Sequence, residues 1–136
     1  MRHTLINCLW VGAGGCVGSI ARYLMSVLGQ RLSIVWPVGT FASNVAGCFL
    51  IGVFSHLALQ TEVLSPSTRL LLTAGFCGGF TTMSSMIYET GQMTQSREYL
   101  HAVVYLGGTV AVCFLAFFAG MLIARLIWKT GGGPWN

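Results

Sequence analysis

Residues 99–124 read YLHAVVYLGGTVAVCFLAFFAGMLIA and contain no Asp, Glu, Lys or Arg. Three further stretches without these residue types cover 3–21, 32–61 and 70–88. A bilayer core about 30 Å thick is crossed by about 20 apolar residues of helix, and each stretch is close to that length or longer. Backbone groups inside lipid must be paired within the chain, which a helix achieves by itself. The four stretches therefore predict an all-α membrane protein with four transmembrane helices.

The overall composition excludes an ordinary water-exposed surface. Charged residues make up 7% of the 136 residues, whereas about a quarter of the residues in a typical soluble domain are charged. The net charge of +4 comes from single basic residues near the ends of the stretches, and not from a basic stripe that would bind nucleic acid. We predict one membrane domain over residues 1–136, with spans near 5–28, 38–59, 70–93 and 99–128 and a flexible tail at 130–136.

No combination of residues typical of an enzyme is present. The five cysteines form no CxxC pair and no Cys/His cluster with metal-ligand spacing, so we interpret them as small apolar residues. The sequence also has no Ser/His/Asp, Cys/His or paired-carboxylate set with the spacing that hydrolysis requires. We predict that the chain is not an enzyme.

Basic residues show only a small bias between the two sides of the predicted spans, with four on the side of the termini and two or three on the opposite side. Membrane orientation depends on an asymmetry of Lys and Arg, so this chain is expected to insert both ways, and a chain that does so can form an antiparallel homodimer. Small residues also recur at four-residue intervals, as at Gly14 and Gly18 or Gly75 and Gly79. Such ladders let helices approach closely in lipid, and they favour a compact oligomer.

The third predicted span contains a glycine pair near its middle. Residues 74–82 read AGFCGGFTT, and Ser84 and Ser85 follow. Paired glycines are poor helix formers, and unwound backbone at membrane depth occurs only where it is buried in protein or lines a cavity. One interpretation is a broken helix whose carbonyls bind a cation and whose N–H groups face an anion. The other is a continuous helix with a tight crossing, and the spacing alone does not separate the two.

Polar side chains inside the second and fourth spans are candidates for a pathway. The amide of Asn44 needs hydrogen-bond partners in lipid, so it either bonds to another helix or lines a wet path. Tyr105, Thr109 and Cys113 follow one another at four-residue intervals and share one helix face. They are typical of one wall of a narrow polar track, although threonines also bond back to their own helix.

Two charged residues, Arg22 and Glu89, lie near the predicted ends of the first and third spans. Charges at the edge of a membrane are functional candidates, and here they indicate either a vestibule rim or side chains that extend to the interface. No acidic residue lies in the middle of a predicted span. Neutral donors without buried carboxylates favour passage of an anion over a cation.

Three stretches together carry a resemblance to a known family: 18–23 (GSIARY), 39–52 (GTFASNVAGCFLIG) and 75–89 (GFCGGFTTMSSMIYE). They resemble the Fluc/CrcB fluoride channels, and the resemblance extends in order over all four spans. It implies an antiparallel, dual-topology homodimer in the bacterial cytoplasmic (inner) membrane. Each dimer would contain two pores for passive export of fluoride, which confers fluoride resistance, and a structural Na⁺ ion at its centre.

The resemblance also assigns roles to individual residues. It implies that the backbone carbonyls of Gly78 and Thr81 from both subunits hold Na⁺, and that Asn44 donates its amide to fluoride. Further matching positions are the polar track Tyr105, Thr109 and Cys113, the hydroxyl residues Ser84 and Ser85, and the charged residues Arg22 and Glu89, whose roles stay open.

One departure from the family pattern concerns Met83 and Met86, which stand where the family has two phenylalanines whose ring edges face the anion. Methionine has no ring quadrupole, but its thioether is polarizable and flexible. The leading hypothesis is a fluoride channel with an altered rate or selectivity. A non-conducting or low-selectivity paralogue is one alternative. A proton-coupled cation exporter is another, and it would need Glu89 as its exchange site.

Overall fold

The computed structural model describes residues 1–33, 36–60 and 64–130, and all regular elements among these residues are helices. Four helical segments are long and apolar enough to cross a membrane: Arg2–Leu32, Val38–Ala58, Pro66–Gln95 and Tyr99–Trp128. The prediction of an all-α chain with four long apolar helices is therefore confirmed, and it is consistent with a membrane protein. Of the tail predicted at 130–136, Thr130 ends the last helix, and residues 131–136 lie outside the described residues.

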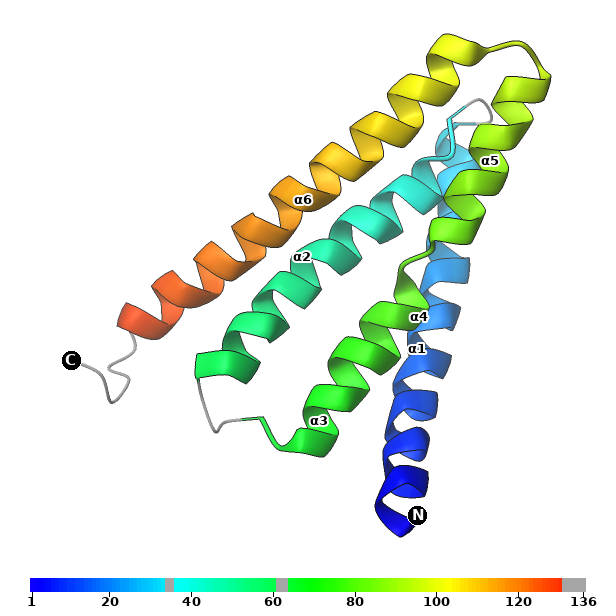
Figure 1. The fold of residues 1–136 in the computed structure, drawn as a ribbon. Helices are drawn as coiled ribbons and strands as arrows, with labels where there is room; N and C mark the ends of the chain where they lie inside the picture. Colours follow the sequence, from blue (N-terminus) through cyan, green and yellow to red (C-terminus); the bar gives the residue numbers. More distant parts are fainter. Residues whose placement is uncertain (34–35, 61–63, 131–136) are drawn as a thin grey trace.

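Three of the four segments are each a single helix, and the third is subdivided (Figure 1). The first, second and fourth are α1 (Arg2–Leu32), α2 (Val38–Gln60) and α6 (Tyr99–Thr130). The third comprises α3 (Pro66–Leu70), the π-helical η1 (Leu71–Cys77), α4 (Gly78–Phe80) and α5 (Met83–Gln95). Between α4 and α5, Thr81 and Thr82 are extended, with φ/ψ of −88°/155° and −151°/112°. The Thr81 N–H still donates to the Cys77 carbonyl at 3.0 Å, so the helical hydrogen-bond pattern is interrupted from Thr82 onward.

Local capping explains where the parts of the third segment begin. Pro66 occupies the first turn of α3, and the Ser65 side chain accepts a hydrogen bond from the Thr68 N–H. The hydroxyl of Thr82 likewise accepts from the Ser85 N–H at 3.1 Å and caps α5. Both caps pair an N–H group that has no partner within its own helix. Thr82 therefore ends the extended stretch and starts the next helix.

Helices α2 and α6 run side by side (Figure 1) and form the most extensive contact between two elements. A glycine on each helix allows this approach. A Cβ atom on Gly52 would collide with the carbonyl oxygen of Phe117, and one on Gly120 would collide with that of Phe49. The two glycines thus let each backbone lie directly against the other.

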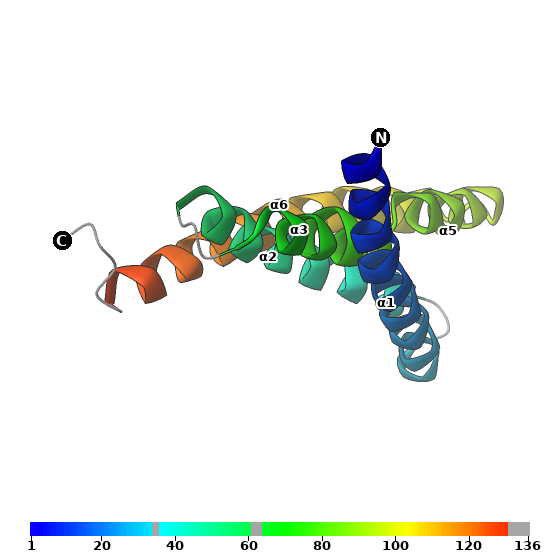
Figure 2. The same ribbon diagram turned by 90° about the horizontal axis from the view of Figure 1, so that it is seen from below.

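Helix α1 crosses the third segment (Figures 1 and 2) and packs on η1 and α4. Its small residues face that contact, because a Cβ on Gly14 would meet the Leu71 carbonyl and one on Gly18 would meet the Phe76 carbonyl. The small-residue ladders therefore allow close helix packing within a single chain. The oligomer that they suggested stays a prediction.

Candidate functional site

The interruption of the third segment is held by Asn44 of α2. The Thr82 N–H donates to Asn44 Oδ1 at 2.6 Å, and Asn44 Nδ2 donates to the Thr82 carbonyl at 3.0 Å. A buried backbone group needs a hydrogen-bond partner, and the amide supplies one for each polar group of Thr82. The Asn44 amide therefore bonds to another helical segment, as one of the two interpretations of its sequence position predicted. The bond to Thr82 uses one of the two N–H groups on Nδ2.

At the interruption, the N–H groups that would donate to two carbonyls in a continuous helix donate to side chains instead. In a continuous α-helix, the Gly78 carbonyl would accept from the Thr82 N–H, and the Thr81 carbonyl would accept from the Ser85 N–H. Here the Thr82 N–H donates to Asn44, and the Ser85 N–H donates to the Thr82 hydroxyl. Gly78 and Thr81 are the residues whose carbonyls the family resemblance assigns to Na⁺.

Arg22 contacts the same region from α1. Its Nε donates to the Gly79 carbonyl at 3.2 Å in a partly buried hydrogen bond. Since α1 continues to Leu32, Arg22 lies well inside the helix and its side chain is held at α4. The guanidinium is a fixed positive charge, and this bond places it beside the interruption of the third segment.

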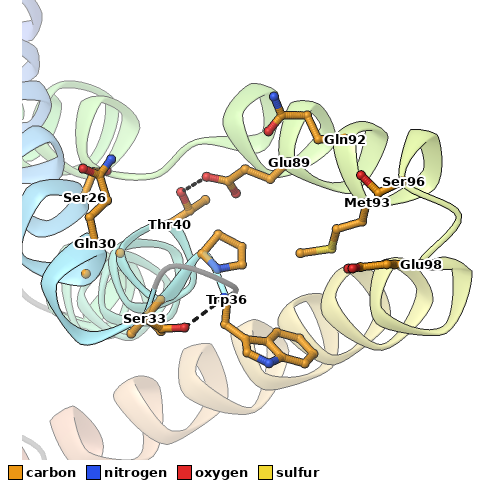
Figure 3. A pocket seen from close by; sticks show the side chains of 14 residues that line it. Ser26, Gln30, Ser33, Trp36, Thr40, Glu89, Gln92, Met93, Ser96 and Glu98 are labelled. Carbon is orange, nitrogen blue, oxygen red and sulfur yellow. Dashed lines mark hydrogen bonds between the residues drawn. The ribbon is translucent and has the colours of Figure 1, made fainter.

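Glu89 of α5 connects three helices. The Thr40 hydroxyl of α2 donates to Glu89 Oε1 at 2.6 Å, and the Tyr105 hydroxyl of α6 donates to Oε2 at 2.6 Å. Figure 3 shows the bond between Thr40 and Glu89. Short O–H···O contacts of this kind are typical of hydroxyls bonded to a carboxylate. Glu89 is thus turned toward the neighbouring helices, and both hydroxyl protons are directed at it.

A cavity of about 640 Å³ lies beside Glu89 (Figure 3). It is lined from α1, the start of α2, α5 and the α5–α6 connection, and no Lys or Arg is among the described residues that line it. Its polar lining comprises Ser26, Gln30, Ser33, Thr40, Glu89, Gln92, Ser96 and Glu98. Glu89 therefore borders a polar, acidic hollow, a position consistent with the vestibule rim suggested by the sequence.

A second cavity, of about 560 Å³, lies beside the interruption, and most of the predicted site residues meet there. Its lining residues come from α2, η1, α4, α5 and α6 and from the extended residues between α4 and α5. Among them are the predicted residues Asn44, Gly78, Thr81, Met83, Met86, Thr109 and Cys113. Met86 is 3% exposed, whereas Met83 is 63% exposed. The two methionines therefore occupy different environments at the same cavity.

Both hydroxyl groups of the predicted polar track on α6 donate hydrogen bonds to protein oxygens. The Thr109 hydroxyl donates to the Tyr105 carbonyl at 2.6 Å, which is the back-bonded alternative noted for threonines. Tyr105 and Thr109 line a smaller cavity of about 310 Å³, and Thr109 and Cys113 line the second cavity. The structure thus brings the three residues beside cavities, although Tyr105 and Thr109 donate to protein oxygens.

Ser84 and Ser85 lie at the start of α5. The Thr82 hydroxyl donates to Ser85 Oγ at 3.1 Å, and the Ser84 and Thr82 hydroxyl oxygens are 3.2 Å apart. The Ser85 oxygen is the acceptor in the bond from Thr82, so the Ser85 hydroxyl proton takes no part in that bond. The helix N-terminus adds partial positive charge and backbone N–H groups to these hydroxyls.

Two residues that the sequence analysis did not assign to the site belong to it. Thr40 binds Glu89, and Thr82 exchanges hydrogen bonds with Asn44 and caps α5. Thr40 lies four residues before Asn44 and therefore on the same helix face, which is a signal that the sequence contained. The role of Thr82 depended on the extended backbone and had no comparable signal.

The fold and these cavities define a multi-pass membrane protein in which polar side chains of four apolar segments face one another. A family model described as CrcB-like protein, Camphor Resistance (CrcB), matches residues 9–121. The chain belongs to this family, and the resemblance inferred from the three sequence stretches is confirmed.

Several curated relatives carry the name fluoride-specific ion channel FluC. The protein of Chlorobaculum tepidum is 50% identical over 88% of this chain and 95% of the relative. That of Chlorobium chlorochromatii is 45% identical over 92% and 95%, and that of Caulobacter vibrioides is 46% identical over 88% and 95%. The family is one of ion channels, so the prediction that the chain is not an enzyme is confirmed.

Proposed function

We propose that this chain forms a passive, fluoride-selective channel that exports F⁻ across the bacterial cytoplasmic membrane and so relieves fluoride toxicity. The observation that carries this proposal is 50% identity to a protein named fluoride-specific ion channel, over 88% of this chain. The two cavities between the apolar helices supply hollows that border hydrogen-bonding side chains such as Glu89 and Asn44. An anion that must shed its water needs such groups along its path.

In the proposed assembly, two chains insert with opposite orientation and form an antiparallel, dual-topology homodimer with two pores. The small bias of basic residues between the two sides of the spans supports insertion in both directions. The interruption at Thr81 and Thr82 then forms a broken third span in each subunit, with its extended backbone at membrane depth. Such backbone is tolerated in lipid only within protein or beside a cavity, and both residues line the second cavity.

A central Na⁺ ion is the proposed partner of the interrupted backbone. The carbonyls of Gly78 and Thr81 would hold it, one pair from each subunit. Support comes from the Thr82 and Ser85 N–H groups, which donate to side chains instead of to these two carbonyls. Backbone carbonyls at a discontinuous helix are established ligands for Na⁺. Among the described residues, no group of three His, Cys, Asp or Glu side chains is placed to hold a metal ion.

The donors proposed for fluoride lie at the start of α5. They are the second N–H of Asn44, the hydroxyls of Ser84 and Ser85, and the positive end of the helix. Tyr105 and Thr109 are proposed to act differently, because their protons are donated to Glu89 and to the Tyr105 carbonyl. They hold Glu89 and the α6 backbone in place beside the path. Cys113 is proposed to border the path at the second cavity.

An efflux assay tests the proposal. The purified protein is reconstituted into liposomes loaded with fluoride or chloride, and an ion-selective electrode follows release after a potassium ionophore is added. Fluoride is expected to leave while chloride is retained, and protein-free liposomes are the control. Equal release of both anions would contradict fluoride selectivity. Release of neither anion would support the non-conducting paralogue.

The cation-exporter alternative is examined with the same liposomes. It has one specific observation in its favour, since Glu89 is turned inward and lies beside a polar cavity. A passive channel moves fluoride down its gradient without an imposed proton gradient. Uptake of a fluorescent cation driven by a pH gradient, together with an absence of fluoride release, would favour the exporter.

A further inference from the structure

Five sulfur-bearing side chains from four elements meet at the second cavity. Cys48 of α2, Cys77 of η1 and Cys113 of α6 line it together with Met83 and Met86 of α5. The two remaining cysteines, Cys8 and Cys16, lie on exposed positions of α1. The cavity therefore brings together three of the five cysteines and two of the six methionines beside the proposed ion path.

Two of these cysteines belong to the two helices that form the most extensive contact in the fold. Cys48 and Cys113 are both half-buried, and both line the second cavity. They belong to α2 and α6, which Gly52 and Gly120 bring into direct backbone contact. The relative placement of the two cysteines is thus set by a close, extensive helix contact.

This arrangement suits a particular class of metal ion. Thiolate and thioether ligands select soft cations. The described residues contain no cluster of three His, Cys, Asp or Glu that could hold a metal, which disfavours Zn²⁺ because zinc takes three or four such ligands. Soft d¹⁰ cations such as Ag⁺, Cu⁺ and Hg²⁺, in contrast, form stable complexes with two sulfurs in a line.

We propose that Cys48 and Cys113 form a binding site for a soft, two-coordinate metal cation. Each thiol releases its proton, two metal–sulfur bonds form, and no change of oxidation state is required. Met86, which is 3% exposed at the same cavity, adds a soft and polarizable neighbour. The bound cation would join α2 to α6 one helical turn from Asn44 and Thr109, which line the same cavity.

Binding is tested with mercuric ion on the purified full-length protein in detergent. Cys8→Ser and Cys16→Ser are introduced first, so that the exposed thiols of α1 do not compete. Mercuric nitrate is titrated while ultraviolet sulfur-to-mercury absorption and the number of remaining free thiols are followed. The first equivalent of Hg²⁺ is expected to remove two thiols per chain.

Single replacements show whether the two thiols act together. In the same background, Cys48→Ser and Cys113→Ser are each compared with Cys77→Ala, the matched control that also removes a cysteine from this cavity. A second bond formed within one molecule raises affinity by about 100-fold or more. Competition with a monothiol is therefore expected to strip Hg²⁺ from the Cys48 and Cys113 variants at about 100-fold lower thiol concentration than from the Cys77 variant.

Other outcomes overturn the site. Equal retention of Hg²⁺ in all three variants, or one thiol lost per metal bound, means that the cysteines react independently. Displacement of Hg²⁺ by equimolar Zn²⁺ would contradict the soft, two-coordinate character. Thermal unfolding provides a second readout, because a cation that joins α2 and α6 raises the midpoint in the Cys77 variant and leaves it unchanged in the other two.

The effect on transport rests on the proposed function, and its result is separable from the binding result. If both proposals hold, Hg²⁺ stops fluoride release from liposomes that contain the Cys77 variant, and Cys113→Ser relieves the block. A protein that binds one Hg²⁺ through two thiols and releases no fluoride supports the metal site and contradicts the channel. Fluoride release by a protein that does not bind Hg²⁺ through two thiols supports the channel and contradicts the metal site.

Discussion

Asn44 and Thr82 exchange two hydrogen bonds, one in each direction, between the α2 side chain and the backbone that separates α4 from α5. This pair joins the second and third apolar segments at the point where the third loses its helical pattern. The same amide is the proposed fluoride donor. Its structural and transport roles are therefore coupled.

Replacing Asn44 with Ala is expected to lower both stability and fluoride release. The change leaves the N–H and carbonyl of Thr82 without these partners, and each unpaired buried group costs about 1–3 kcal/mol. Thermal unfolding in detergent and liposome efflux measure the two effects. Asn7→Ala, at an exposed position of α1, is the control. An unchanged unfolding midpoint for Asn44→Ala would contradict the contribution of this pair.

Replacing Tyr105 with Phe is expected to destabilise the protein by about 1.5–3 kcal/mol, the usual value for a hydrogen bond to a charged group. The change removes the donor to Glu89 Oε2 and retains the ring. Tyr88→Phe is the control, because Tyr88 is 66% exposed. A double-mutant cycle with Glu89→Gln is expected to show coupling, and additive effects would argue against the bond.

Replacing Gly120 with Ala is expected to disrupt the contact between α2 and α6. The added methyl would collide with the backbone carbonyl of Phe49, which cannot move aside as a flexible side chain would. Gly107→Ala is the matched control on the same helix, because nothing lies within 4 Å of a Cβ there. Size-exclusion profiles and unfolding midpoints measure the result. Equal folded yields for the two variants would show that the contact between α2 and α6 does not depend on Gly120.

Replacing the two methionines with Phe is expected to have unequal effects on stability. Met86 is 3% exposed, so a larger ring overpacks its site at a cost of about 1–3 kcal/mol. Met83 is 63% exposed and accepts the ring with little change. Both variants, and the double variant, are compared in fluoride and chloride efflux. Fluoride release that occurs only in the double variant would support the non-conducting paralogue.

Removing Na⁺ is expected to lower the thermal unfolding midpoint if the Gly78 and Thr81 carbonyls hold this ion. A ligand that binds only the folded state stabilises it by about 2.7 kcal/mol at a concentration 100 times its dissociation constant. The protein is therefore exchanged into N-methylglucamine chloride, and NaCl or KCl is titrated back at constant ionic strength. An equal response to both salts would indicate screening and would contradict a specific Na⁺ site.

The amino-acid sequence by itself determined the membrane class, the four apolar helices and the family. Hydrophobic length reports directly on the thickness that a helix must cross. The family was identified from three local stretches of residues, which needed no knowledge of how the helices pack. Most of the predicted site residues also meet at one cavity, because their spacing placed them on shared helix faces.

Tertiary structure decided which polar atoms are paired. Sequence spacing left open whether Asn44 packs or lines a path, and only the position of Thr82 showed that its amide binds extended backbone. Sequence spacing also placed Tyr105 on a polar track. In the folded chain α5 lies close enough for the Tyr105 hydroxyl to donate to Glu89. Hydrogen-bond partners far apart in the chain depend on how helices cross, and the crossings here depend on backbone contacts at glycines such as Gly18 and Gly52. These are properties of the folded arrangement and not of any one helix.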